Sequence, residues 1–174
     1  ERIVSAWAEL FPDIPALNAG EMTVEDGIGV GEFSTDGRAL RLATMNMPIP
    51  QPEIDHAASV SWMWPEGQEA VKAQRAHAIA MTAGKDVSAV QAAFDVSRLV
   101  AAVAKAGESV GVYWGNGMLV HKPELFIDAV SSFDAEGPPV MLWVNVLISG
   151  RSANGPFTLS THGMPNFGHK ELEV

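Results

Sequence analysis

The chain has 174 residues, of which 47% are hydrophobic and 18% are charged, a balance that excludes disordered and collagen-like chains. Its 21 acidic and 11 basic residues give a formal charge of −10, so a phosphate backbone would be repelled and we expect no nucleic acid partner. Cysteine is absent, which excludes disulfide frameworks and thiol nucleophiles and fits a cytoplasmic location.

The N-terminal part of the chain predicts a helix, a hairpin and a second helix. Apolar residues at helical spacing predict an amphipathic helix over residues 2–11. Two β-rich stretches at 28–34 and 38–45 flank an Asp-Gly turn signal and predict a hairpin. Three prolines within residues 46–56 predict a loop or an extended crossing segment. A Pro-Glu pair then opens a helix that runs over residues 65–73.

The chain from residue 76 onward shows sharper patterns. Asp86 or Ser88 is suited to cap a long helix, and Gly107 supplies a left-handed stop at its end. An Asn-Gly turn between two short strands is the strongest short-range hairpin signal. In order, we expect a strand at 76–82, that helix to about residue 106, strands at 110–114 and 118–121, a helix from 123 and a strand at 140–149.

This order of elements is that of a ferredoxin-like βαββαβ unit at about 76–149. Its two helices are expected on one face of an antiparallel sheet. Further strands are expected at 156–162 and 170–174. Since no linker divides the chain, we predict a single α+β domain over residues 1–174, with a mostly antiparallel sheet, an N-terminal helix–hairpin–helix extension and C-terminal strands.

The predicted strand at 140–149 is apolar on both faces. Alternate residues from Val140 to Ile148 form one face, and the intervening residues from Met141 to Ser149 form the other. Because a wet apolar face is unfavourable, the second face requires a cover. A homodimer through the sheet and a covering N-terminal layer are the two hypotheses. The apolar run is well short of the roughly 20 residues of a membrane span, so no membrane partner is expected.

Four stretches of the chain carry a family resemblance. The most specific is Thr-x-Gly-x-x-x-Phe-Gly-x-x-Glu-Leu-Glu, which starts at Thr161. The others are Trp62-Met63-Trp64, Ala76-His77-Ala78-Ile79 and Gly111-Val112-Tyr113-Trp114. Together they resemble the bacterial family called domain of unknown function 4261, over residues 43–174. The resemblance implies a bacterial origin and a cytoplasmic α+β domain, and it transfers no activity, substrate or catalytic residue.

Four side chains near the C-terminus are the strongest chemical candidates: His162, His169, Glu171 and Glu173. Imidazole and carboxylate groups ligate divalent metals, and two nitrogens with one oxygen leave a coordination position open for water. His162, His169 and Glu171 are therefore the metal candidates, and His169 and Glu171, joined by His77, are the catalytic candidates. The alternative is a glycine-containing turn followed by a solvated edge strand, whose charges discourage aggregation.

His77 and Asn145 are polar residues within apolar strands. A buried Asn must find hydrogen-bond partners for its amide, and an imidazole titrates near neutral pH. One interpretation is a structural pair, in which His77 bonds a carbonyl or Asn145. The other is a polar pocket that both residues share.

Aromatic residues form a second group of binding candidates. They can line a wall against a ligand or partner, or they can lie in the core with each indole N–H bonded at its edge. The candidates for ligand binding are Trp62, Trp64 and Trp114 together with Asn145, and Tyr113 and Trp143 belong to the same aromatic group.

We predict a non-catalytic cytoplasmic protein that binds a protein or a small molecule, with a homodimer as the simplest partner and no cofactor. The alternative is a metal-dependent or acid–base hydrolase centred on His162, His169 and Glu171, with a divalent metal as its cofactor. Convergence of His77, Asn145, His162 and Glu171 in one concave pocket favours an enzyme or a ligand binder. Their dispersal favours an interaction or structural role.

Overall fold

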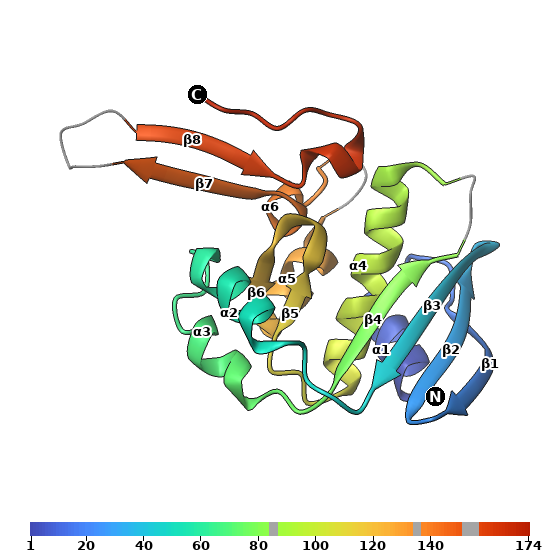
Figure 1. Ribbon diagram of the computed structural model, residues 1–174. Helices are drawn as coiled ribbons and strands as arrows, with labels where there is room; N and C mark the ends of the chain where they lie inside the picture. Colours follow the sequence, from blue (N-terminus) through green and yellow to red (C-terminus); the bar gives the residue numbers. More distant parts are fainter. Residues whose placement is uncertain (84–86, 134–136, 151–156) are drawn as a thin grey trace.

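The computed structural model describes residues 1–83, 87–133, 137–150 and 157–174 and confirms the α+β class (Figure 1). Its largest sheet has four antiparallel strands in the order β1-β2-β3-β4. These strands are β1 (Asn18–Glu25), β2 (Ile28–Thr35), β3 (Arg38–Met45) and β4 (His77–Thr82).

Two tight turns connect the first three strands. Asp26-Gly27 has φ of 50° and 80°, and Asp36-Gly37 has φ of 48° and 73°. Asp tolerates this left-handed region and Gly adopts it freely, so Asp-Gly suits a two-residue hairpin turn. The predicted hairpin of β2 and β3 is confirmed. The sequence patterns do not indicate β1, because all eight of its residues are exposed and no buried face enforces alternation.

A central helix, α4 (Ala89–Ala106), packs against α1 (Arg2–Leu10), α5 (Pro123–Ser132) and β4. Together with the four-stranded sheet, these helices make up what we call the sheet lobe. Side chains from α1, α4 and the sheet share one core with α5. Its largest fully buried members include Trp7, Leu40, Leu99, Phe126 and Trp143.

The two ends of α4 test two sequence predictions. The Oγ of Ser88 caps the helix by accepting a hydrogen bond from the backbone N–H of Gln91 at 3.2 Å, which confirms that residue as the cap. Asp86, the other predicted cap, lies outside the described residues. Gly107 has φ of −118° and ψ of −177°, an extended conformation, so the prediction of a left-handed stop is wrong.

A buried carboxylate joins α4 to the hairpin of β2 and β3. Asp95 accepts hydrogen bonds from Nε and Nη2 of Arg38 at 2.6 and 3.3 Å and from Nε2 of Gln91 at 2.9 Å. Arg38 also bonds Asp36 in the hairpin turn at 2.7 Å. The buried carboxyl group of Asp95 is therefore paired with a cation and hydrogen-bonded, as a buried polar group must be.

A second, smaller core lies beside the sheet lobe, and we call the elements around it the small lobe. They are α2 (Gln51–Val60), α3 (Gly67–Ala70), the turn η1 (Val71–Ala73), β5 (Val112–Trp114), the turn η2 (Gly115–Gly117) and β6 (Leu119–His121). The Oγ of Ser61 joins α2 to β6, because it accepts from Val120 N and donates to Ala57 O, both at 2.7 Å.

The prediction of a loop over residues 46–56 is wrong in part, because α2 begins at Gln51. Pro52 stands in the first turn of this helix, where no intrahelical N–H bond is lost. The proline-rich composition therefore hid a helix start. The predicted helix at 65–73 is confirmed as the consecutive turns α3 and η1, and the predicted Asn-Gly hairpin as β5 and β6.

The C-terminal part forms a ribbon that projects from the body (Figure 1). It consists of β7 (Asn145–Gly150) antiparallel to β8 (Phe157–His162), and of a third strand at 172–174 that bonds Leu159 and Thr161 of β8. The helical turn α6 (Val140–Trp143) precedes the ribbon and the turn η3 (Met164–Phe167) follows β8.

The root of the ribbon is closely packed. A Cβ added to Gly117 would lie 2.5 Å from the carbonyl oxygen of Trp143, and one added to Gly163 would lie 2.8 Å from it. Gly163 also has φ of 116°, which side chains rarely adopt. Glycine at these two positions therefore allows three chain segments to cross at Trp143.

The predicted ferredoxin-like unit is not confirmed as one sheet. Its elements follow the predicted order, but β4 pairs with β3, β5 with β6 and β7 with β8, so the strands belong to three sheets. The predicted strand at 140–149 starts at Asn145, because one turn of helix occupies Val140–Trp143 directly after two prolines. Within the main sheet the prediction of helices on one face holds, since Ile79 and Met81 of β4 remain exposed on the other face.

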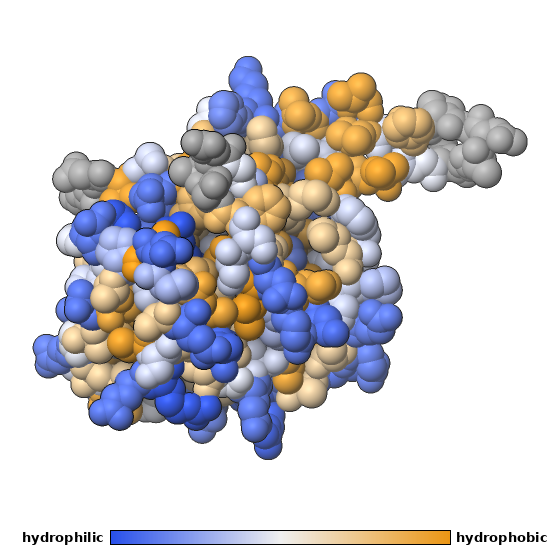
Figure 2. Space-filling view, turned by 180° about the vertical axis from the view of Figure 1, so that it is seen from behind, coloured by the Kyte–Doolittle hydropathy of each residue, from blue (hydrophilic) through white to orange (hydrophobic). Residues whose placement is uncertain are grey.

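One face of the ribbon is apolar and exposed. Residues opposite one another in the three strands share a face, and on this face the side chains are Val146, Ile148, Phe157, Leu159, Thr161, Leu172 and Val174. The exposed fractions of Ile148, Phe157 and Val174 are 71%, 69% and 85%. Figure 2 shows these hydrophobic side chains gathered along the projecting arm. The predicted apolar face therefore exists, and no other described element covers it.

Candidate functional site

A cleft of about 1010 Å³ lies between the sheet lobe and the small lobe. Two runs of consecutive residues line it. They are 76–80, in and before β4, and 110–116, in and around β5. Figure 1 shows β4 at the edge of the four-stranded sheet and β5 in its separate hairpin with β6. A volume of this size is at the upper end of the range of pockets for small ligands, roughly 300–1,000 Å³.

The walls of the cleft are mainly apolar. On the side of α4 they are formed by Val96, Val100 and Val103, and on the side of the small lobe by Ile49, Ile54 and Val71. Gln74 fixes the crossing segment on this side, since its Oε1 accepts from Ile49 N at 3.0 Å and its Nε2 donates to Ile49 O at 3.1 Å. The wall is thus held in place by hydrogen bonds rather than by packing alone.

His77 is one polar group of the cleft. Its Nδ1 lies 2.7 Å from the carbonyl oxygen of Met47. Because a carbonyl can only accept, Nδ1 carries the hydrogen, and in the neutral ring Nε2 is left with a lone pair. No hydrogen bond within the described part of the chain engages that Nε2, so it is available to accept from a ligand.

Tyr113 and Glu53 are a second polar group. Burial raises the pKa of the Tyr113 hydroxyl, and the neighbouring Glu53 carboxylate raises it further. The phenol is therefore protonated at neutral pH, and its one hydrogen is directed at Glu53. Arg75, Glu108 and Asn116 are among the other polar residues of the lining. A few polar groups set in apolar walls are the arrangement that orients a bound ligand.

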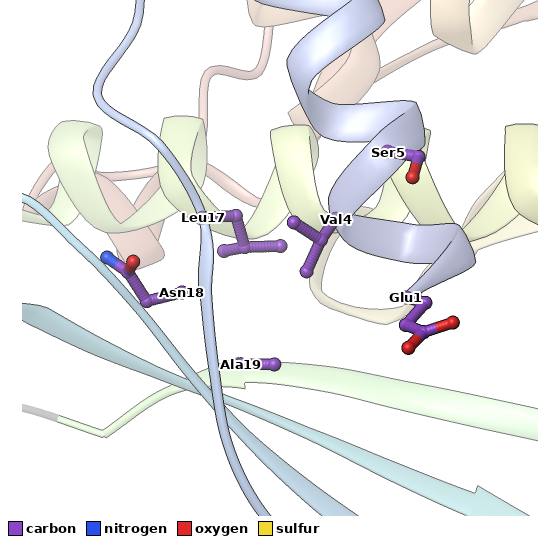
Figure 3. A pocket seen from close by; sticks show the side chains of 6 residues that line it. All are labelled: Glu1, Val4, Ser5, Leu17, Asn18 and Ala19. Atoms are coloured by element: carbon purple, nitrogen blue, oxygen red, sulfur yellow. The ribbon is translucent and has the colours of Figure 1, made fainter.

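A second hollow, of about 570 Å³, lies between the start of α1 and the start of β1. Six residues line it: Glu1, Val4, Ser5, Leu17, Asn18 and Ala19. Figure 3 shows the apolar side chains of Val4 and Leu17 turned toward each other, with Glu1 at the rim. With one carboxylate and no imidazole in its lining, this hollow offers less chemistry than the cleft.

The C-terminal histidines and carboxylates do not gather as a metal site. Glu171 accepts hydrogen bonds from the Thr161 hydroxyl and from the Gly163 and Met164 backbone N–H groups, at 2.7, 2.7 and 3.4 Å. Among the described residues, no three His, Asp or Glu side chains are placed to hold a metal ion, and His162, His169 and Glu171 are among those residues. Glu171 instead stabilises the turn that follows β8.

The ionisation of Glu171 follows from these bonds. Desolvation favours the neutral acid, but the hydrogen bonds from Thr161, Gly163 and Met164 and the charge of His162 outweigh it and lower the pKa of Glu171. The group is therefore a carboxylate at neutral pH, with both oxygens engaged by its own turn.

Asn145 is fully buried at the root of the ribbon, where it pairs with His162 in the β7–β8 register. Neither its Oδ1 nor its Nδ2 has a hydrogen-bond partner among the described residues. It does not line the cleft, and neither do His162 or Glu171. Convergence of His77, Asn145, His162 and Glu171 in one pocket was expected of an enzyme or a ligand binder. Of these four residues, only His77 lines the cleft.

The predicted aromatic wall is divided between three locations. Trp143 is buried and stacks on Trp114 and on Phe167, with ring centroids 6.3 and 5.5 Å apart. Trp64 is buried in the core of the small lobe, and Trp62 is 59% exposed on the surface. Trp114 is thus the one member of the predicted trio Trp62, Trp64 and Trp114 that lines the cleft.

The positions of Glu53 and His121 are not indicated by any of the sequence patterns described above. Glu53 lies in the segment predicted as a loop, so its position in α2 facing Tyr113 has no visible signal. His121 is buried, and its Nε2–H donates to the Leu142 carbonyl at 3.1 Å. Burial lowers the pKa of His121 to about 4, against the opposing effect of this hydrogen bond, so the ring is neutral at pH 7.

Comparisons of the chain with models of protein families, with curated proteins and with solved structures find no match. The resemblance to the domain of unknown function 4261 family therefore stays a prediction. Within the described ranges, no helix has the length and hydropathy needed to cross a bilayer.

Proposed function

We propose that this protein is a non-catalytic, cytoplasmic binding domain of bacterial origin whose binding site is the cleft between the two lobes. The observation that carries the proposal is a hollow of about 1010 Å³ with apolar walls into which His77, Tyr113 and Glu53 bring polar groups. The Nε2 of His77, which no described residue engages, and the Tyr113 hydroxyl beside Glu53 are suited to orient a ligand, and the apolar walls supply affinity through burial.

The hydrolase alternative has less support. It requires a free carboxylate beside two imidazoles, and both oxygens of Glu171 accept hydrogen bonds from the turn that follows β8. A divalent metal would have to displace those bonds before it could use Glu171 as a ligand.

The binding proposal is tested with the neutral dye Nile red and ¹⁵N-labelled protein. We expect dye-induced chemical shift changes at residues 76–80 and 110–116, which line the cleft. Ala78 is exposed and lines the cleft, so an Ala78→Trp variant fills it and should abolish these changes. A Met22→Trp variant, on the exposed outer strand β1, is the matched control and should retain them. Shift changes elsewhere alone, or equal changes in both variants, would refute the proposal.

We also infer a homodimer through the apolar face of the ribbon. The chain carries a charge of −10, and two copies repel each other over most of their surface. The seven side chains that the structure places on the ribbon face carry no charge, and Glu173 lies on the opposite side. The Glu171 carboxylate reaches only Thr161, at the root of the ribbon. Each large side chain that such contact fully buries contributes roughly 1.5–3 kcal/mol. A two-fold axis would bring two copies of this one face together.

Sedimentation velocity over a range of concentrations tests the homodimer. Ile148 and Ser149 are neighbours on opposite faces of β7, and both are exposed. An Ile148→Asp variant should be monomeric, whereas Ser149→Asp should behave as the unmodified chain. If the unmodified chain is a monomer at the highest concentration, or if both variants dissociate equally, the inference fails.

A further inference from the structure

Two strand edges border the cleft, and each presents backbone groups to it. β4 is the last strand of the four-stranded sheet, with β3 on one side. β5 belongs to a two-stranded hairpin, with β6 on one side. Because successive side chains of a strand point to opposite faces, lining by the unbroken residue runs 76–80 and 110–116 indicates that the edges of these strands face the cleft.

The register of β3 and β4 identifies which groups of β4 point into the cleft. The N–H of Ala83 donates to Ala39 O at 2.9 Å, one step beyond the last paired residues of the two strands. Because hydrogen-bonded and non-bonded pairs alternate along an antiparallel ladder, the odd-numbered residues of β4 bond to β3. The even-numbered residues Ala78 and Ala80 direct N–H and C=O away from β3, toward the cleft.

The same reasoning applies to β5. The N–H of Val120 in β6 donates to Ser61 Oγ at 2.7 Å and thus points away from β5. Val120 therefore belongs to a non-bonded pair, and its partner in the register is Tyr113. Tyr113 must direct its own N–H and C=O away from β6, to the side of the cleft.

These outward backbone groups have no partners within the described part of the chain. No hydrogen bond between described residues engages the N–H or C=O groups of Ala78, Ala80 or Tyr113 on the cleft side. Ala78 and Ala80 present donors and acceptors at strand spacing, Tyr113 presents one more of each from β5, and together these groups match one chemistry, an extended polypeptide backbone. We propose that the cleft binds an extended peptide segment of another protein, which adds as a strand between β4 and β5 and joins the two sheets. This inference rests on the proposed binding function of the cleft.

The lining indicates the composition of that peptide. The titratable lining includes two carboxylates, Glu53 and Glu108, against one guanidinium, Arg75, in a chain whose charge is −10. A peptide with net positive charge is complementary to this field. The small side chains of Ala78 and Ala80 leave room for β-branched residues beside them, and the valines of α4 favour apolar side chains on the residues that face the helix. Six residues, the length of β4, span about 20 Å.

The test uses a defined synthetic heptapeptide, acetylated and amidated, with lysine at both ends and valine and threonine alternating between. Titrated into ¹⁵N-labelled full-length protein, it should shift the resonances of residues 76–80 and 110–116 and slow amide exchange at Ala78 and Ala80. An Ala78→Pro variant lacks the outward N–H but keeps the ladder to β3, since proline is tolerated where an edge N–H is unpaired. We expect it to weaken binding by about tenfold. Ala78→Val, which retains the N–H, is the matched control and should bind normally.

A second peptide, N-methylated at alternate residues, removes the same hydrogen bonds from the ligand side and remains informative if Ala78→Pro unfolds. Equal binding of the methylated peptide, or of Ala78→Pro, would show that the ligand does not add as a strand. Shifts at the cleft with Nile red but none with the peptide would overturn this inference and leave the proposed function standing, whereas none with either would overturn both. Concentration-dependent shifts at 76–80 without peptide would assign the edge to a second copy of the chain and refute the inference.

Discussion

The main sheet and the ribbon are built on the same alternation of apolar and polar side chains, yet their apolar faces differ. In β3, Leu40 and Leu42 are buried beneath the helices of the sheet lobe, whereas Ile148 and Phe157 of the ribbon are exposed. The cause lies in the element that follows. After β4 the chain continues into α4, which packs on a face, and after β8 it forms a turn and a third strand, which adds to an edge. Alternation thus determines which residues share a face, and the next element determines whether that face is covered.

The largest expected effect is in the sheet lobe, at the buried ion pair of Asp95 and Arg38. An Asp95→Ala variant removes the buried carboxylate that Arg38 shares with Arg98, whose side chain is only 12% exposed, and we expect a loss of about 3–5 kcal/mol in the free energy of unfolding in urea. The control is Glu32→Ala, which breaks the exposed pair of Glu32 and Arg41 and should cost less than about 1 kcal/mol. Equal losses would contradict the view that α4 is fastened to the hairpin by a buried charge.

The contrast between a covered and an uncovered apolar face is tested most directly by two residues of one segment, Leu142 and Ile148. Leu142 is buried before the start of β7, and Ile148 is exposed within it. We expect Leu142→Ala to lower the free energy of unfolding by roughly 2–5 kcal/mol and Ile148→Ala to change it by less than about 0.5 kcal/mol, both measured in dilute protein. A large loss for Ile148→Ala at low concentration would show that the ribbon face is covered within one chain.

The free energy of unfolding should fall at acidic pH because of the buried His121. Its pKa is lowered from 6.5 to about 4 in the folded protein, so the unfolded chain takes up the proton first as the pH falls. The contribution is fully present above pH 6.5, is lost progressively down to about pH 4 and then levels off, a total of ~3 kcal/mol. Urea unfolding across this window measures it. The His121→Gln variant keeps a donor for Leu142 without titrating and should show a shallower slope, and identical slopes would contradict the assignment.

The local elements of the fold were largely predictable, because each has a local signal. The Asp-Gly turn, the hairpin of β5 and β6, the cap at Ser88 and the helix start at Pro123 are confirmed. The pairing of the strands was not predictable from the same signals. The βαββαβ order describes the chain correctly, but the partner of each strand depends on contacts between distant segments, and β4 pairs with β3 instead of with a later strand.

The candidate site was predictable only in part. His77 and Trp114 were named from the sequence, and both line the cleft. Glu53 was not, because the prolines before it hid α2. Glu171 was named as a ligand or catalyst, whereas its carboxylate is bonded to its own turn. A residue type indicates what chemistry a side chain can perform, and its hydrogen-bond partners decide what it is free to do.

Asn145 offers a test at the boundary between body and ribbon. Its amide is buried without a partner among the described residues, which carries a desolvation penalty of about 1–3 kcal/mol. Replacement by the similarly sized Leu removes this penalty, so we expect Asn145→Leu to raise the free energy of unfolding by about 1–2 kcal/mol. Val144→Ala, at the adjacent buried position, controls for packing and should destabilise. A loss of stability in Asn145→Leu would show that the amide has a partner, such as a buried water.

The smallest expected effect is at Glu171. It tests whether this carboxylate stabilises the turn that follows β8 or belongs to a metal site. The carboxylate accepts from the N–H of Gly163, so Glu171→Ala should speed amide exchange at Gly163 about fivefold, the equivalent of ~1 kcal/mol, with little change in global unfolding. Because the pKa of Glu171 is lowered, protection is present above the ordinary carboxyl range and is lost as the pH falls through the folded value. Glu173→Ala, two residues farther along and without these bonds, is the control. Unchanged exchange in Glu171→Ala would refute the role of Glu171 in the turn. Protection at His169 on addition of zinc would instead support the metal hypothesis, in which the ion orients the carboxylate.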